Sequence, residues 1–279
     1  GNMEKAVEIL REKGLAAATK KAGRIAAEGV VTSVVDEAKK IGVVLEVNSE
    51  TDFVAKNPIF NEFVAALAKI VLEQNPADVD ALKACAGPDG MTVEKMLQEK
   101  VMTIGENIQI RRFVRLEGDL VSYVHGGGKI GVMVKFDTDL GSKEAFKVYG
   151  KDVAMHIAAM KPAALSAEQV DPALIERERS IAQQKAEEDS AKAVAEGKKA
   201  QPADIIARRI EGSVQKFLKE VSLLNQPFVK NDKQSVGQML KEKNTTIKSY
   251  TLYVVGEGLE KKSDDFAAEV AAQMAAAKA

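Results

Sequence analysis

The sequence predicts an α+β protein with a core of two subdomains, each built from antiparallel sheet and packed helices. Amphipathic helical patterns alternate with β-branched runs over the first part of the chain, which indicates mixed helix and strand. A long stretch rich in Glu, Lys, Gln and Ala then interrupts the strands, and strand signals resume after it. We therefore expect an inserted antiparallel helical hairpin, forming a coiled-coil arm, and a C-terminal docking helix.

The N-terminal segment has apolar residues at helical spacing. They recur at i, i+3, i+4 and i+7 from Met3 to Leu10, so residues 3–13 predict an amphipathic helix ended by Gly14. Residues 15–28 are rich in Ala and Lys and predict a connecting helix. Because almost nothing precedes the apolar stripe, we expect the chain to open partway through a small helical module, or this helix to dock elsewhere.

Two β-branched runs, residues 30–35 and 41–47, flank a polar segment and predict a β-hairpin. Alternate apolar residues of the second run share one strand face. Asn57-Pro58 then matches a helix N-cap followed by Pro at the first helical position. The apolar stripe of the helix predicted behind it is Phe60, Phe63, Val64, Leu67 and Val71.

The second half of the chain changes composition. Residues 172–220 predict two antiparallel helices joined by a turn at 197–202. Their narrow apolar seam is predicted to have Leu174 and Ile181 on one side and Ile206, Ile210, Val214, Phe217 and Val221 on the other. A disordered charged linker is the alternative, because the apolar content is thin. A final helix is predicted from Ser263. The other predicted elements are helices 92–104 and 142–160 and strands 108–116, 120–125, 130–136 and 246–255.

These patterns divide the chain into six predicted segments. Because strand signals resume after the charged helices, the arm is expected to be inserted into the second subdomain. The segments are 1–28, a remnant of an N-terminal helical module with a connecting helix; 29–112, the core N-subdomain; 113–168, the first part of the core C-subdomain; 169–221, the arm; 222–260, the second part of the core C-subdomain; and 261–279, a C-terminal helical module.

Composition argues against several functional classes. The chain has 40 Lys and Arg residues against 41 Asp and Glu, so it lacks the cationic field that holds nucleic acid. One cysteine, Cys85, rules out an intramolecular disulfide and a multi-cysteine metal site and fits a reducing compartment. No apolar run approaches the ~20 residues that span a bilayer, and the N-terminus lacks the pattern of a secretion signal. We therefore expect a cytosolic chain without a membrane partner.

The tetrapeptide Thr51-Asp52-Phe53-Val54 is the most informative motif. It places an acid and a large aromatic side chain between a predicted strand and a predicted helix. On a surface connector held by rigid elements, such a pair can enter another protein. The alternative is structural: Thr and Asp near a helix start satisfy backbone N–H groups, and a neighbouring Phe packs into the core.

No residue set predicts catalysis, a metal site or a cofactor site. His125 and His156 are far apart in sequence, and packed or hydrogen-bonded histidines are commoner than catalytic ones. Gly126-Gly127-Gly128-Lys129 does not match a phosphate-binding loop, and a hairpin turn explains it. Cys85 has no nearby histidine. We expect no enzymatic activity.

Several separated motifs carry a family resemblance across nearly the whole chain. They are Asn48 to Asn57, Ile104-Gly105-Glu106-Asn107-Ile108 with Arg111-Arg112, Ala154 to Ala159, Glu220-Val221-Ser222-Leu223 with Gln226-Pro227-Phe228-Val229, and Asp265 to Val270. In these motifs and their order the sequence resembles the elongation factor Ts family. Members of that family are guanine-nucleotide exchange factors for elongation factor Tu in bacterial-type translation.

The resemblance implies three contacts with elongation factor Tu. Thr51, Asp52, Phe53 and Val54 correspond to the family segment that reaches the partner's magnesium site. Ile104, Gly105 and His125 are implied in a second contact with a β-barrel domain of the partner. Phe266 and Val270 on the terminal helix, and the N-terminal helical module, are implied to touch its nucleotide-binding domain.

The resemblance also sets expectations for the whole protein. It implies no cofactor, a bacterial cytoplasm or an organelle as the location, and a complex that is able to pair into a homodimer. Family members begin with a complete small helical domain, whereas this chain opens at what would be its last helix. We therefore expect most of that domain to be lacking, and direct binding of nucleic acid is not expected.

Two other classes of function remain as alternatives. A ribosome- or RNA-binding module of translation would use the basic pairs Arg111-Arg112 and Lys198-Lys199, although the chain offers no aromatic stacking platform. A hydrolase would use His125 or His156.

Overall fold

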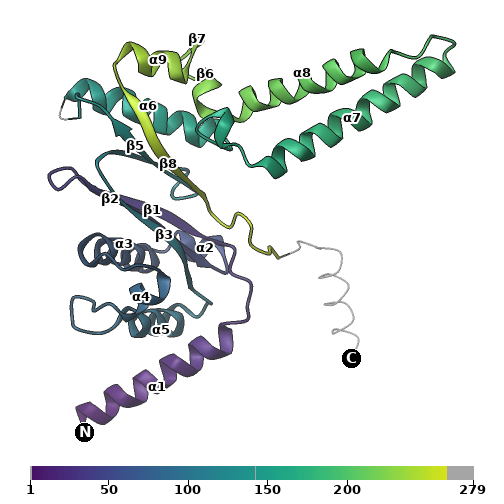
Figure 1. Ribbon diagram of the computed structural model, residues 1–279. Helices are drawn as coiled ribbons and strands as arrows, with labels where there is room; N and C mark the ends of the chain where they lie inside the picture. Colours follow the sequence, from purple (N-terminus) through teal and green to yellow (C-terminus); the bar gives the residue numbers. More distant parts are fainter. Residues whose placement is uncertain (1, 142, 263–279) are drawn as a thin grey trace, which may run out of the picture.

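The computed structural model describes residues 2–141 and 143–262 and shows two three-stranded antiparallel sheets packed face to face, with helices on both outer faces and a separate two-stranded sheet (Figure 1). The helices are α1 (Met3–Lys21), α2 (Asp52–Ala55), α3 (Pro58–Gln74), α4 (Val79–Ala84), α5 (Val93–Ile104), α6 (Glu144–Met160), α7 (Pro172–Ala195), α8 (Ala203–Val221) and α9 (Val236–Glu242). The strands are β1 (Glu28–Asp36), β2 (Ile41–Ser49), β3 (Gln109–Glu117), β4 (Asp119–His125), β5 (Ile130–Asp137), β6 (Pro227–Phe228), β7 (Asn231–Ser235) and β8 (Thr246–Val254). This arrangement confirms the predicted α+β class.

The first sheet has the order β1-β2-β3, and α3, α4 and α5 cover its outer face. The predicted hairpin is confirmed, with Glu28 opposite Ser49 and Asp36 opposite Ile41. Val43, Leu45 and Val47 face the helices in one core cluster, as their alternation predicts. β3 pairs with β2 as far as Glu117, past the predicted end of the N-subdomain at residue 112.

The second sheet has the order β4-β5-β8, with α6 and α9 on its outer face. β8 follows the arm in sequence and pairs with β5, so the sheet continues after the inserted helices, as predicted. Gly126, Gly127 and Gly128 form the β4–β5 turn with φ values of 63°, 65° and 97°, a region that suits glycine. The glycine run is therefore a hairpin turn.

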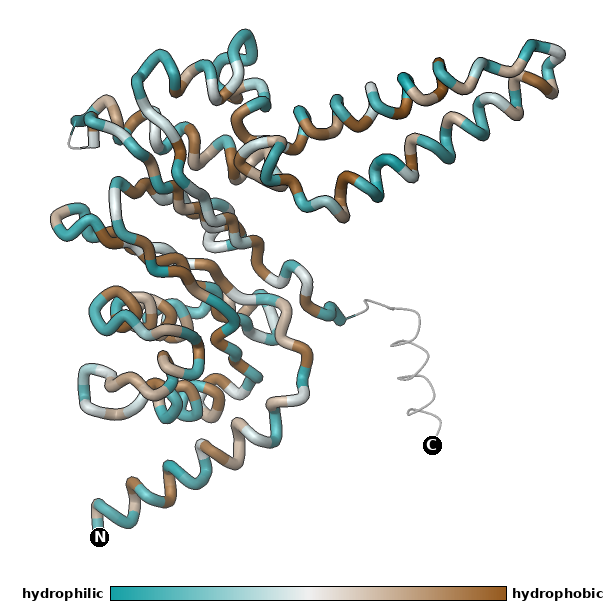
Figure 2. The backbone as a smooth tube through the Cα atoms, viewed as in Figure 1, coloured by the Kyte–Doolittle hydropathy of each residue, from teal (hydrophilic) through white to brown (hydrophobic). Residues whose placement is uncertain are grey.

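The two sheets approach closely because glycines face the opposite sheet. A Cβ atom added to Gly131 would lie 2.2 Å from Cγ1 of Val31, and one added to Gly42 would lie 2.8 Å from Met133. Val31, Val44, Leu120 and Met133 form the core between the sheets. β2 is consequently buried on both faces, and apolar residues concentrate along the strands (Figure 2).

The N-terminal helix differs from its prediction. α1 continues through Gly14 to Lys21, and residues 22–27 that follow are not helical. Gly14 does not end the helix because it is the point at which α1 lies against α5, where Gln98 is the neighbour. The first half of α1 extends away from the body and leaves Met3 79% and Leu10 51% exposed.

The arm consists of α7 and α8, which project from the body as an antiparallel hairpin (Figure 1). The disordered-linker alternative is therefore wrong. The predicted seam is partly wrong, because Leu174 and Ile181 are exposed, while Ala186 of α7 and Val214 of α8 are the buried residues. Arg179 and Glu211 add an ion pair of 3.0 Å across the hairpin.

His156 is buried in α6, where its two ring nitrogens have different partners. The backbone N–H of Val229 donates to Nδ1 at 3.2 Å, so Nδ1 must be unprotonated and the proton lies on Nε2. Nε2 then donates to Oε1 of Gln226 at 2.9 Å, and the amide nitrogen of Gln226 donates to the carbonyl of Glu220. Burial lowers the pKa of His156, against the opposing effect of Gln226. This is the packed, hydrogen-bonded histidine that the sequence favours.

Two further regions differ from the prediction or fall beyond it. The short helices α4 and α9 are absent from the prediction, although Asp78 caps the first and a Ser235–Gln238 capping box begins the second. The C-terminal helix predicted from Ser263, with Phe266 and Val270, lies outside the described residues. Among the helices that the structure describes, none is long and apolar enough to cross a membrane.

Replacement of Gly131 tests the close contact between the sheets. We expect Gly131→Ala to lower the free energy of unfolding by about 1–3 kcal/mol, because Val31 is buried and cannot move away from the added methyl group. Urea denaturation measures the change. Gly212→Ala is the control, since nothing lies within 4 Å of the added atom and a solvated helix gains up to about 1 kcal/mol from Ala. Equal stability of Gly131→Ala and the wild type would contradict the packing argument.

The burial of His156 predicts a pH-dependent stability. Its folded pKa is below the ordinary histidine value of 6.5, so below that pH the unfolded chain binds a proton that the folded chain does not. The free energy of unfolding should therefore fall as the pH drops through about 6.5, by at most about 1.4 kcal/mol per pH unit. Denaturation at about pH 7.5 and about pH 5.5 measures the slope. We expect the slope to shrink in His156→Gln and to persist in His125→Ala.

Candidate functional site

Residues 51–54, which we call the projecting turn, connect β2 to α3. Thr51 has an extended backbone, with φ −123° and ψ 157°, and its hydroxyl accepts the N–H of Val54 at 3.3 Å. Thr51 thereby caps the single helical turn α2, and Asn57 with Pro58 starts α3 directly after it. The position between a strand end and a helix start agrees with the prediction.

Phe53 points away from the protein. Its exposed fraction is 80%, whereas Ala55 is buried and Val54 packs against the core of the first sheet. The alternative in which Phe53 packs into the core is therefore wrong, although the capping role of Thr51 is correct. Asp52 is half-exposed and has an ion pair of 3.4 Å with Lys56, which contributes little in solvent.

A set of hydrogen bonds from Glu50, Thr51, Glu106 and Asn107, which we call the Glu106 network, holds the base of the projecting turn. The Glu106 carboxylate accepts the backbone N–H groups of Glu50 at 3.0 Å and Thr51 at 3.1 Å. It also accepts the Thr51 hydroxyl at 2.6 Å. In return, the N–H of Asn107 donates to the Glu50 carboxylate at 2.7 Å. The loop after α5 therefore fixes the start of α2.

Ile104 and Gly105 lie immediately before this network, at the end of α5. Gly105 has φ 85° and ends the helix, and its carbonyl accepts Nζ of Lys21 at 2.7 Å. Ile104 is half-buried against the core. Asn107 also donates from its side chain to the carbonyl of Arg24 at 2.7 Å. The segment that follows α1 is thereby attached to the same region.

His125 ends β4 and is exposed, with Nδ1 2.8 Å from the hydroxyl of Tyr123. The adjoining hairpin turn lies against the start of β1, where the N–H of Val31 donates to the carbonyl of Gly128 at 2.7 Å. Glu28, at the start of β1, pairs with Ser49 at the end of β2 and forms an ion pair with Lys129 of the hairpin turn. The projecting turn and His125 therefore lie toward the same end of the two sheets. Gly105, beside the Glu106 network, lies there as well. Among the described contacts, no hydrogen bond or ion pair joins His125 to Ile104 or Gly105.

Comparison with known proteins decides the family. The model of the family described as "Elongation factor TS" matches residues 50–257, which include the Glu106 network, β3 of the first sheet and all three strands of the second sheet. A relative named elongation factor Ts from Variovorax paradoxus (strain S110) is 58% identical over 284 residues, covering 100% of this chain and 89% of the relative. The chain belongs to the elongation factor Ts family. A relative of the same name from Ralstonia nicotianae (strain ATCC BAA-1114 / GMI1000) is 57% identical, covering 100% of this chain and 88% of the relative.

Membership of the elongation factor Ts family makes this chain a translation elongation factor that acts in protein biosynthesis. A relative from Polaromonas sp. (strain JS666 / ATCC BAA-500), also named elongation factor Ts, is 56% identical, and the match covers 90% of its length. The family match includes the projecting turn, Ile104, Gly105 and His125. The resemblance stated from the motifs is therefore confirmed.

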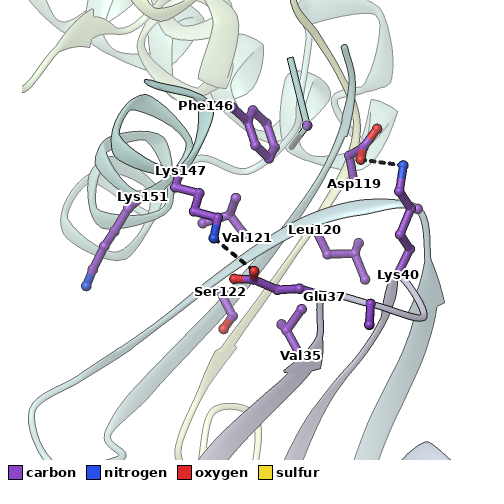
Figure 3. A pocket seen from close by; sticks show the side chains of 13 residues that line it. Val35, Glu37, Lys40, Asp119, Leu120, Val121, Ser122, Phe146, Lys147 and Lys151 are labelled. Carbon is purple, nitrogen blue, oxygen red and sulfur yellow. Dashed lines mark hydrogen bonds and ion pairs between the residues drawn. The ribbon is translucent and has the colours of Figure 1, made fainter. Parts of the chain in front are cut away.

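A cavity of about 620 Å³ lies at the opposite end of the sheets (Figure 3). It is lined by the β1–β2 turn, β4 and α6, and two ion pairs cross it: Glu37 to Lys147 at 2.9 Å and Lys40 to Asp119 at 3.0 Å. None of the predicted site residues lines it. The length of the nine-residue strand β2, roughly 28 Å, separates this cavity from the projecting turn.

The basic pair Arg111 and Arg112 is directed to a buried acid that no sequence pattern indicated. Glu46 of β2 is fully buried and accepts Arg111 at 3.1 Å and Arg112 at 2.7 Å. Burial would raise the pKa of Glu46, but hydrogen bonds from the N–H of Gly256, from Arg112 and from Asn48 outweigh it and lower the pKa. The single carboxylate offsets one of the two positive charges and engages both guanidinium groups inside the protein, which weakens the RNA-binding alternative.

Of the two histidines named in the hydrolase alternative, His156 is inaccessible. His156 is fully buried and both of its ring nitrogens have partners, so substrate cannot reach it. No group of three His, Cys, Asp or Glu side chains suited to a metal ion occurs within residues 2–141 and 143–262. Cys85 is half-buried, and its thiol contacts the carbonyl of Ala81 at 3.4 Å.

Proposed function

We propose that this chain is a guanine-nucleotide exchange factor that binds elongation factor Tu and promotes release of GDP. The observation that carries the proposal is Phe53, an 80% exposed aromatic side chain on a turn whose base is fixed. A large apolar side chain in that position has no partner within the described part of the chain. Membership of the elongation factor Ts family supports elongation factor Tu as the partner.

The mechanism follows from the chemistry of the bound nucleotide. A GTPase holds its nucleotide through Mg²⁺, which demands near-ideal octahedral geometry between phosphate and protein oxygens. Phe53 inserts between packed side chains of the partner, and Asp52 perturbs groups that support the metal. The metal and then the phosphates lose affinity. The chain itself makes and breaks no bond, so it is not an enzyme in the covalent sense.

The mutual weakening of nucleotide binding and factor binding explains how the factor is released. If binding of the factor weakens nucleotide binding by a given ratio, nucleotide binding weakens the factor by the same ratio. Abundant GTP therefore displaces the factor from elongation factor Tu. Each ~1.4 kcal/mol of interaction free energy that forms only in the transition state for release speeds release about tenfold.

The other contacts proposed for the partner are those that the family resemblance implies. Ile104, Gly105 and His125 supply the second contact. Phe266 and Val270 extend the contact beyond the described residues. The proposed setting is the bacterial cytoplasm, in agreement with the bacterial relatives.

Phe53→Ala tests the insertion. We expect the maximal rate of stimulated GDP release to fall about tenfold or more, because the transition state loses the inserted ring. The affinity for elongation factor Tu should change by about twofold or less, because the remaining surface still docks. The assay follows labelled GDP leaving elongation factor Tu as the concentration of the factor is raised.

Ile59→Ala is the matched control for Phe53→Ala. Ile59 is 46% exposed on the neighbouring first turn of α3, and its loss should leave release unchanged. An undiminished maximal rate in a correctly folded Phe53→Ala variant would count decisively against the insertion.

His125→Ala should have the converse effect. Because His125 is exposed at the end of β4 and is assigned to docking, its loss should raise the dissociation constant about tenfold. The maximal rate of GDP release should remain close to that of the wild type. Calorimetric titration against elongation factor Tu measures the affinity, and an unaltered dissociation constant would refute the assigned contact.

A further inference from the structure

We propose that Glu106 is a positioning residue for nucleotide release, which fixes the direction of the projecting turn relative to the docking surface at Ile104 and Gly105. The inference rests on the exchange function proposed above and names a residue that orients the projecting turn. Glu106 itself need not touch the partner, because it acts through Thr51.

The hydrogen bonds to Glu106 all come from the two residues at which β2 gives way to α2. One carboxylate oxygen, Oε2, accepts both backbone N–H groups, and the other, Oε1, accepts the Thr51 hydroxyl at 2.6 Å. Hydrogen bonds to an ionised carboxylate are about twice as strong as those between neutral groups. Three of them on one side chain fix both the position and the rotation of the turn.

The attachment is reciprocal. Glu50 accepts the N–H of Asn107 at 2.7 Å, and Arg24 lies 3.6 Å from the same Glu50 carboxylate. Asn107 is 3% exposed, so its contacts are protected from water. These bonds join the loop after α5 and the start of α2 into one rigid unit, although Thr51 and Glu106 are 55 positions apart in sequence.

The remaining attachments of the projecting turn are local: the Ser49 hydroxyl donates to the Thr51 carbonyl at 2.9 Å, and the Asn61 side chain donates to the Ala55 carbonyl, just after the turn, at 2.9 Å. They join the turn only to the strand and the helix on either side of it, whereas Glu106 joins it to the loop after α5.

α2 is a single turn of four residues, and only Val54 and Ala55 pack against the core. The ion pair between Asp52 and Lys56 lies within the turn and in solvent, so it does not orient the turn against the body. Without Glu106, Phe53 would have to be ordered during insertion, which disfavours the transition state for release more than docking.

The expected signature is therefore a change in rate rather than in affinity. In the labelled-GDP assay with elongation factor Tu, Glu106→Ala should lower the maximal release rate about tenfold. The concentration of factor that gives half of the maximal rate should change by about twofold or less. Glu106→Gln should restore most of the rate, because its amide oxygen can accept the backbone N–H groups while its amide nitrogen donates to Thr51.

Glu94→Ala is the matched control. Glu94 lies in the first turn of α5, the helix whose other end leads into Glu106; its side chain is 46% exposed and has a long ion pair of 4.0 Å with Lys83. It should leave the release rate unchanged. Thermal unfolding of all the variants, each as the full chain, identifies any loss of rate that comes from unfolding.

A double-mutant cycle with Phe53→Ala separates positioning from a general structural effect. If Glu106 acts by directing Phe53, Glu106→Ala should have almost no further effect in the Phe53→Ala background. A full additional loss in that background, or an unchanged rate in Glu106→Ala alone, would overturn the assignment of Glu106. An unchanged rate in Phe53→Ala alone would instead contradict the proposed function.

Discussion

Val31, Val44 and Met133 meet between the two sheets at a place where Gly42 and Gly131 have no side chains to keep the strands apart. This close contact positions the other parts of the body. It buries β2 on both faces and brings the β4–β5 hairpin against β1, so that His125 lies toward the same end as the projecting turn. The two sheets come from separate stretches of sequence, and their packing brings the residues of the proposed contacts to one end of the molecule.

Burial of β2 on both faces has an electrostatic consequence. A strand that is covered on both faces exposes no side chain to water, so the buried carboxylate of Glu46 needs positively charged or hydrogen-bonding partners inside the protein. Arg111 and Arg112 of the neighbouring strand supply the positive charge, and Gly256 beyond β8 supplies a backbone N–H. Arg112 also lies 4.1 Å from the ring centre of Tyr253. The cluster joins both sheets at the point where the chain leaves β8, which explains a basic pair that by sequence alone resembles a nucleic-acid contact.

Local sequence patterns predicted the structure correctly where interactions between residues close together in the chain decide it. Asn57-Pro58 starts α3, the glycines after His125 make a turn, and the β-branched runs on either side of residues 36–40 form a hairpin. They failed where a neighbouring element decided the outcome. Gly14 has the composition of a helix end, but packing against α5 keeps it helical, and Ala186 rather than Ile181 occupies the seam of the arm.

The sequence by itself determined the family, the α+β class, the order of most elements and the tetrapeptide that carries the proposed function, because periodicity, caps and motifs are written in consecutive residues. Only the tertiary structure decided that Phe53 faces solvent and that Glu106 holds its base. Exposure depends on what the rest of the chain leaves uncovered, and the bond from Thr51 to Glu106 joins residues 55 positions apart. No local pattern encodes such a contact, since it forms only when the folded core brings the end of α5 beside the end of β2.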